Sequence, residues 1–212
     1  MTRDEAVAFI KEICGYRQTG DATIIKMLER AQTELQRGPT FPWFLLSERA
    51  QILTTIDDER IPLPTDFLGE YEDDGIWLRV DNDDPEQDIL LEKDDLDLLR
   101  GLYKNTSGQP ISYSKDGLYF RLFPTPDAEY QLRMQYYQKG TSLLSGNIEN
   151  EWLKYSPNSV IGKAGYWYAS TLRDQEAKAT FKEMETEARV VLETENESRK
   201  HTNRRYQVGG PE

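Results

Sequence analysis

The stretch ISYSKDGLYFRLF, residues 111–123, decides the fold class, because it predicts a β-hairpin in the middle of the chain. Ile111–Ser114 and Leu118–Phe123 are typical of strands, and the Asp116-Gly117 pair between them tolerates the positive φ angles of a tight turn. Glu129–Tyr137 follows after two prolines and favours a third strand. We therefore expect a three-stranded antiparallel meander.

The third strand of this meander is apolar on one face only. One face carries Tyr130, Leu132, Met134 and Tyr136, and the other carries Gln131, Arg133 and Gln135. This alternation is typical of a sheet packed on one side, and we expect the C-terminal helices to cover it. Two more half-buried strands are predicted at Ala50–Ile56 and Ile76–Val80, so the β-rich part spans about residues 49–137.

Both ends of the chain show the apolar periodicity of helices. The predicted helices span residues 2–14, 21–37, 157–172 and 175–195. Thr2 and Glu5 have the spacing of a capping box, and Pro157 suits the first position of a helix. We expect Ser156, just before it, to accept a hydrogen bond from a free N–H of the first turn.

The helical periodicity ends near Glu195, and residues 196–212 carry no apolar stripe. We expect them to form an extended C-terminal arm without structure of its own. The sequence thus predicts an α+β protein in which N- and C-terminal helices form a bundle and a central, mainly antiparallel β-sheet is inserted between them. Residues 1–195 are expected to make a single domain.

The charge of the chain is concentrated in one segment. The whole chain has a net charge of −12, and residues 57–100 hold 17 acidic and four basic side chains, a net charge of −13. Like charges repel each other and favour exposure to water. The plainest interpretation of this acidic segment is a set of solvated loops and a solvated helix face.

The reactive side chains give little basis for catalysis. The chain has one histidine, His201, and one cysteine, Cys14, so neither a zinc site nor a histidine-based triad is expected. The glycines form no phosphate-binding loop, and Asp81–Pro85 resembles a calcium loop without its glycine and last glutamate. We therefore expect no enzymatic activity, no cofactor and no bound metal.

Membranes and nucleic acids are not expected as binding partners. Apolar runs such as Phe44–Leu46 are far shorter than the roughly 20 residues that cross a bilayer. The first residues lack the apolar core of a secretory signal, so we expect synthesis in the cytoplasm. Acidic side chains outnumber basic ones by 38 to 26, which disfavours direct binding of DNA.

Several motifs follow one another in a distinctive order. The most specific is Leu63-Pro64, a spacer and Asp66-Phe67-Leu68, which comes after Leu53-Thr54-Thr55. The others are the helical stretch Ile24–Leu35, Trp43-Phe44-Leu45, Glu151-Trp152-Leu153, Ser156-Pro157 and the helix through Arg173-Asp174. In this order the chain resembles the head-to-tail adaptor (connector) proteins of short-tailed bacteriophages, over residues 20–195.

This resemblance implies a structural virion protein in the neck between head and tail, made in the host cytoplasm. It implies a ring of about twelve copies, closed by rotation, that binds the phage portal protein on one side and a tail or nozzle protein on the other. Adaptor C-termini commonly reach the portal. The implied portal-docking arm has as its candidate residues Arg199, Lys200, Arg204, Arg205 and Tyr206.

The resemblance also suggests a role for the acidic segment, because genome DNA must pass through such a ring without specific binding. A lining that repels phosphates favours this, and the candidate residues for an acidic channel or rim are Asp73, Asp74, Asp81, Asp83 and Asp84. Two alternatives stay open at this point. One is an acidic DNA mimic that occupies the DNA site of a host enzyme, and the other is a carbohydrate-active or metal-dependent enzyme built on the carboxylates.

Overall fold

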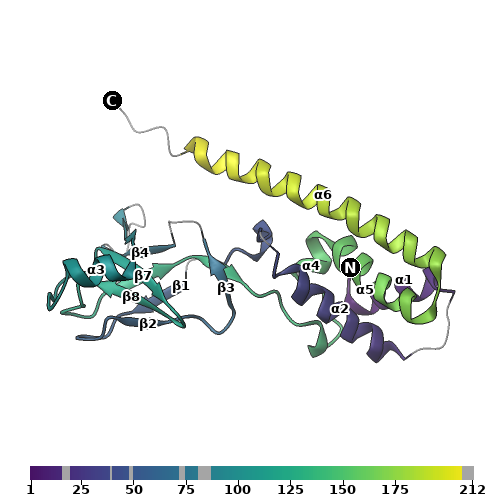
Figure 1. Ribbon diagram of the computed structural model, residues 1–212, viewed down its shortest axis with the longest axis horizontal. Coiled ribbons are helices and arrows are strands. Elements are labelled where there is room, and N and C mark those ends of the chain that lie inside the picture. The colour runs from purple at the N-terminus through teal and green to yellow at the C-terminus, as the bar shows by residue number, and fades with distance from the viewer. Residues whose placement is uncertain (16–19, 39, 48–49, 72–74, 81–86, 207–212) are drawn as a thin grey trace. The chain divides into compact units, whose positions relative to one another are not determined.

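The computed structural model describes the chain except for residues 16–19, 39, 48–49, 72–74, 81–86 and 207–212 (Figure 1). The chain forms two compact units. The helical unit consists of Met1–Leu45 and Gly140–Glu212, and the sheet unit consists of Leu46–Lys139. In the sequence, the sheet unit is inserted between two helical parts, which confirms the predicted α+β class.

The helical unit contains most of the elements that periodicity predicts. Its members are α1 (Arg3–Ile13), α2 (Asp21–Leu35), the 3-10 helices η1 (Trp43–Leu45) and η3 (Leu143–Ser145), α4 (Glu151–Tyr155), α5 (Pro157–Leu172) and α6 (Gln175–Tyr206). The short α4 is not among the predicted helices, because five residues are too few to show a stripe. Its N-terminus is capped by Asn150, whose side chain accepts a hydrogen bond from the Leu153 N–H at 3.0 Å.

The helix starts follow the predicted caps with one exception. The capping box is confirmed, since the Glu5 N–H donates to Thr2 Oγ1 and the Thr2 N–H donates to Glu5 Oε2 at 2.8 Å. The prediction for Ser156 is wrong: its hydroxyl lies 2.7 Å from the Ser159 hydroxyl instead of capping the helix. The Ser159 N–H already donates to the Ser156 carbonyl at 3.2 Å, and the two buried hydroxyls satisfy each other.

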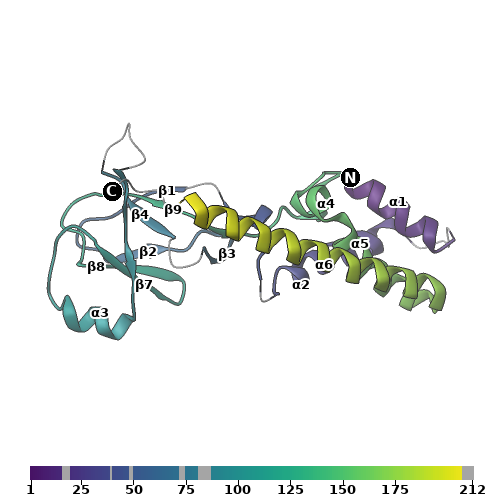
Figure 2. The same ribbon diagram turned by 90° about the horizontal axis from the view of Figure 1, so that it is seen from above.

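α5 packs against both α2 and α6 (Figures 1 and 2). Its buried stripe includes Val160, Ile161, Ala164 and Tyr168. Two glycines let α6 approach closely. A Cβ at Gly165 would lie 2.7 Å from Cγ of Phe181, and one at Gly162 would lie 2.7 Å from the backbone nitrogen of Glu185. No larger residue fits at either position without moving α6.

α6 is longer than the sequence indicates. It runs as one helix from Gln175 to Tyr206 (Figure 2), a rise of about 48 Å at 1.5 Å per residue. The predicted helix end near Glu195 is therefore wrong, and so is the extended arm for residues 196–206. Residues 207–212 lie outside the described part of the chain.

The sheet unit is mainly antiparallel. Its elements are β1 (Ala50–Leu53), β2 (Arg60–Pro62), β3 (Phe67–Glu70), β4 (Ile76–Leu78), β5 (Ile89–Leu90), β6 (Glu92–Lys93), α3 (Leu96–Leu102), β7 (Ser112–Asp116), β8 (Tyr119–Phe123), β9 (Gln131–Met134) and β10 (Tyr136–Gln138). One sheet has the strand order β1-β9-β4-β5, a second has β2-β8-β7-β6, and β10 pairs with β3. Only the β6–β7 pairing is parallel among these strands.

The predicted hairpin is present, but the predicted meander is not. β7 and β8 pair from Ser112 to Asp116, and Gly117 in the turn has a φ of +61°. β9 belongs to the other sheet, where it pairs with β1 and β4. Pro124 and Pro126 follow β8 and have no N–H to donate to a neighbouring strand. The chain therefore leaves this sheet, and β2 takes the place beside β8.

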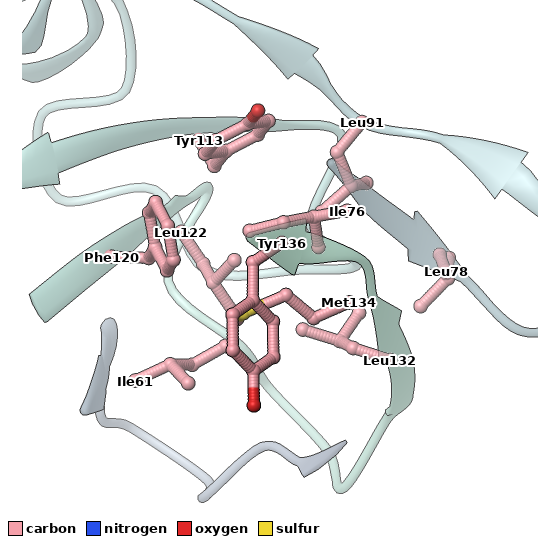
Figure 3. Packing of buried hydrophobic residues seen from close by; sticks show 10 residues of the cluster. All are labelled: Ile61, Ile76, Leu78, Leu91, Tyr113, Phe120, Leu122, Leu132, Met134 and Tyr136. Atoms are coloured by element: carbon pink, nitrogen blue, oxygen red, sulfur yellow. The ribbon is translucent and has the colours of Figure 1, made fainter. Parts of the chain in front are cut away.

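The core of the sheet unit lies between its own strands (Figure 3). The cluster comprises Ile61, Ile76, Leu78, Leu91, Tyr113, Phe120, Leu122, Leu132, Met134 and Tyr136. The predicted apolar face of the Glu129–Tyr137 stretch is thus confirmed. The prediction that the C-terminal helices cover this face is wrong, because strands of the second sheet bury it with Phe120 and Leu122. Two sheets that face each other need no helix between them.

Candidate functional site

The candidate residues fall into two regions, the C-terminal arm and the acidic segment. The arm candidates Arg199, Lys200, Arg204, Arg205 and Tyr206 all lie on α6. The acidic candidates Asp73, Asp74, Asp81, Asp83 and Asp84 lie outside the described residues. The arm residues up to Tyr206 therefore lie on one continuous helix.

The base of the arm is fixed to Trp43 of η1. The Asn196 side-chain oxygen accepts a hydrogen bond from the Trp43 backbone N–H at 3.0 Å, and the indole N–H of Trp43 donates to Glu195 Oε2 at 3.4 Å. The Arg199 guanidinium lies over the indole, with Cζ 3.6 Å from the ring centroid, as in a cation–π interaction. We call Trp43, Glu195, Asn196 and Arg199 the arm clasp.

Asn196 explains why the sequence pattern ends too early. It is 6% exposed and follows Ala188 and Leu192 at a spacing of four residues, so it continues the inward stripe of α6 with a polar side chain. A buried amide is costly unless it has a hydrogen-bond partner, and the Trp43 N–H supplies one. The four-residue spacing from Ala188 and Leu192 to Asn196 could have shown that the helix continues. A search for apolar residues at helical spacing misses this, because asparagine is polar.

Trp43 is supported by a cluster of aromatic rings. Its ring centroid lies 4.8 Å from that of Tyr155 and 5.6 Å from that of Phe44. Phe44 in turn stacks on Tyr155 at 5.4 Å and meets Trp152 edge-on at 5.2 Å. Because Phe44 and Trp152 are buried, the clasp rests on the core of the helical unit.

Part of the acidic segment is neutralised by basic side chains. Glu59 forms an ion pair with Arg121, which also donates to Asp116 Oδ2 at 2.6 Å. The hydrogen bond with Asp116, followed by that with Glu59, raises the pKa of Arg121. Asp58 accepts the backbone N–H of Arg60 at 2.9 Å, and this bond holds the pKa of Asp58 below its ordinary value.

Other carboxylates of the segment are also engaged. The ion pairs join Glu70 to Lys93 and Lys115, Asp88 to Arg133, and Asp97 to Arg100. Asp95 caps α3 by accepting the N–H groups of Asp97 and Leu98 at 2.9 and 3.3 Å. The view of the segment as solvated loops alone is therefore incomplete, since several of its acids pair with bases of the sheet unit or cap α3.

The described part of the chain shows no cluster of metal-ligating side chains. Its histidine, cysteine, aspartate and glutamate side chains nowhere gather in groups of three or more that could hold a metal ion. Within the same residues, no helix combines the length and the apolar character that crossing a membrane requires.

Comparison with known proteins identifies the family of the chain. A search of curated proteins found no match. A family model described as "SU10 adaptor protein" matches residues 1–208, which takes in the sheet unit, all of α6 and the helical unit up to residue 208. Such a family implies a structural, non-enzymatic protein of the phage neck with portal and tail partners. The chain therefore belongs to the SU10 adaptor protein family and is a phage head-to-tail adaptor.

Proposed function

We propose that this adaptor works as one subunit of a ring of about twelve copies, closed by rotational symmetry, between the portal and the tail or nozzle protein. The observation that carries the proposal is the family match over residues 1–208. The match extends over the sheet unit, most of the helical unit and all of the long helix α6. A ring subunit of this kind requires no chemistry.

The end of α6 is proposed to be the arm that docks on the portal. The helix is fixed at its base by the arm clasp, and beyond the clasp the sequence holds Lys200, Arg204, Arg205 and Tyr206. Arginine and tyrosine are the side chains that most often anchor protein interfaces. A helical arm also has less freedom to lose on binding than an unstructured one.

The acidic segment is proposed to line the channel or its rim. The described acids are partly paired with bases, so the proposal rests on the clusters at residues 72–74 and 81–86 and on the net charge of −13. A carboxylate lining repels DNA phosphates and lets the genome slide without being held. In assembled particles, replacement of Asp81, Asp83 and Asp84 by Lys should slow genome release, whereas replacement by Asn should slow it less.

Electron microscopy of the purified protein mixed with its portal tests the ring. We expect a coaxial ring of added density on one end of the portal, whose class averages give the number of copies. A chain truncated after Arg199 keeps the clasp and loses the rest of the arm, so it should leave portals bare. If the full chain also leaves portals bare, the proposed docking is wrong.

A further inference from the structure

We propose that Trp43 is a positioning residue for the C-terminal arm: through the arm clasp it fixes the register of α6, so that the docking segment begins at Lys200. This inference rests on the proposed docking function of the arm. It assigns Arg199 to the clasp and removes it from the portal contacts that the sequence suggested.

The geometry of the clasp fixes the position of the helix along its own axis. Glu195, Asn196 and Arg199 lie within little more than one turn, and all three contact Trp43. The bond to Asn196 comes from the backbone of Trp43, so a rotamer change of the indole cannot adjust it. A shift of α6 by one residue, about 1.5 Å along the axis, would break this bond and leave a buried amide without its partner.

The face of the Arg199 guanidinium that covers Trp43 is not available to the portal. The guanidinium covers the Trp43 ring with one face, and that ring also contacts the rings of Tyr155 and Phe44. A portal contact through that same face of the guanidinium would require it to leave this ring. The arm thus divides into an anchored part, Glu195–Arg199, and a docking part that starts at Lys200.

The test compares variants on the two sides of the clasp in the full chain. Trp43→Leu removes the aromatic ring and leaves Arg199 free, whereas Arg199→Ala removes the cation. Arg189→Ala is the matched control, because Arg189 lies on the same helix and pairs with Glu193 on the surface. Hydrogen exchange of the amides at 196–206 and the affinity for isolated portal rings are measured for each.

Both clasp variants should speed exchange at 196–206 and weaken portal binding by about 2- to 5-fold, the range expected for one cation–π contact at a surface. The double variant should be no worse than the stronger single variant, because Arg199→Ala removes a cation–π contact that Trp43→Leu has already removed. Arg199→Lys should restore part of the loss, and Arg189→Ala should change neither measurement.

Two results would overturn the inference. Unchanged exchange in both variants means that the clasp does not hold the helix. Portal affinity that is unchanged or higher in Trp43→Leu and lower in Arg199→Ala means that Arg199 is a portal contact. Failure of the docking function itself gives a different result. A chain truncated after Arg199 would then still bind portals, and the exchange of the full chain would still show whether the clasp holds α6.

Discussion

The guanidinium of Arg133 lies 2.8 Å from the carboxylate of Asp88, and both side chains are buried, at 11% and 2% exposure. The second carboxylate oxygen of Asp88 has no hydrogen-bond partner among the described residues. Among the described residues, Arg133 is therefore the group that balances the buried negative charge of Asp88. Burying two charges is expensive, and the pair stabilises the fold only while both members are present.

Removal of one partner should be far worse than removal of both. We expect Arg133→Met to lower the free energy of unfolding by about 3–5 kcal/mol, and the double variant with Asp88→Leu to recover a large part of the loss. Urea denaturation measures both. The exposed pair of Arg189 and Glu193 is the control, and Arg189→Ala should cost about 0.5 kcal/mol or less. A double variant that loses the sum of the Arg133→Met and Asp88→Leu losses would show that the charges do not depend on each other.

The glycines of α5 predict a second stability effect. Gly165→Ala and Gly162→Ala should each destabilise the helical unit by about 1–3 kcal/mol, because the added methyl group meets the ring of Phe181 or the backbone of Glu185. Gly101 in α3 is the matched control, since a Cβ there meets nothing within 4 Å. Gly101→Ala should raise stability by up to about 1 kcal/mol. Thermal melts that rank the three variants otherwise would contradict the close packing of α5 and α6.

Those parts of the fold that depend on neighbours in the sequence could be predicted. The capping box of Thr2 and Glu5 and the Asp116-Gly117 turn are made by residues a few positions apart, so the sequence shows them directly. Strand partners are different, because β9 pairs Arg133 with Gln51 across a long stretch of chain. The apolar face of β9 fits either sheet, and the prolines after β8 were the only hint that it changes sheets.

The site could be predicted only in part for the same reason. Basic residues and the family resemblance pointed to the C-terminal arm, but the clasp joins Trp43 and Asn196, which are 153 positions apart. A single sequence does not indicate that a tryptophan near a turn contacts an asparagine in a distant polar stretch. The paired acids were hidden similarly, because Glu59 and Asp88 find their bases, Arg121 and Arg133, on other strands.

Tyr136 predicts how stability changes at high pH. Its hydroxyl donates to Asp66 at 3.0 Å, and burial together with this bond raises the pKa of Tyr136 to about 12. The folded state therefore holds the phenolic proton more tightly than the unfolded chain, whose tyrosine pKa is about 10. The stabilisation is complete below pH 10 and is lost as the pH rises from 10 to about 12.

Tyr136→Phe should make the free energy of unfolding fall less steeply as the pH rises from 10 to about 12. Unfolding free energies at several pH values between 9 and 12 measure this slope. Tyr130 is the comparison, since it makes the same kind of bond to Asp127 in a more exposed position. Tyr130→Phe should change the slope less, because water screens its interactions. An unchanged slope in Tyr136→Phe would show that other groups control the alkaline transition.

The acidic clusters predict a response to charge removal. Replacement of Asp81, Asp83 and Asp84 by Asn should leave the melting temperature unchanged or slightly higher, because like charges repel each other. Added salt should stabilise the natural protein slightly, since charges more than about 10 Å apart are screened at 0.1 M. Glu59→Gln is the contrast: it breaks the ion pair with Arg121 and should cost up to about 1 kcal/mol. A strong loss in the triple variant would mean that these acids bind an ion or internal bases.

Two truncations of α6 separate the anchored part of the arm from its docking part. An arm without structure of its own could be removed from residue 196 onward without loss of stability. The clasp predicts otherwise: truncation after Glu195 deprives the Trp43 N–H of Asn196 and its ring of Arg199. The expected cost is about 1–2 kcal/mol, which corresponds to a fall in melting temperature of about 2–8 °C for a chain of this size.

Truncation after Arg199 retains all four clasp residues and should melt like the full chain. Asn196→Ala in the full chain should reproduce part of the loss, and identical melting of both truncated proteins would show that the clasp contributes nothing to stability.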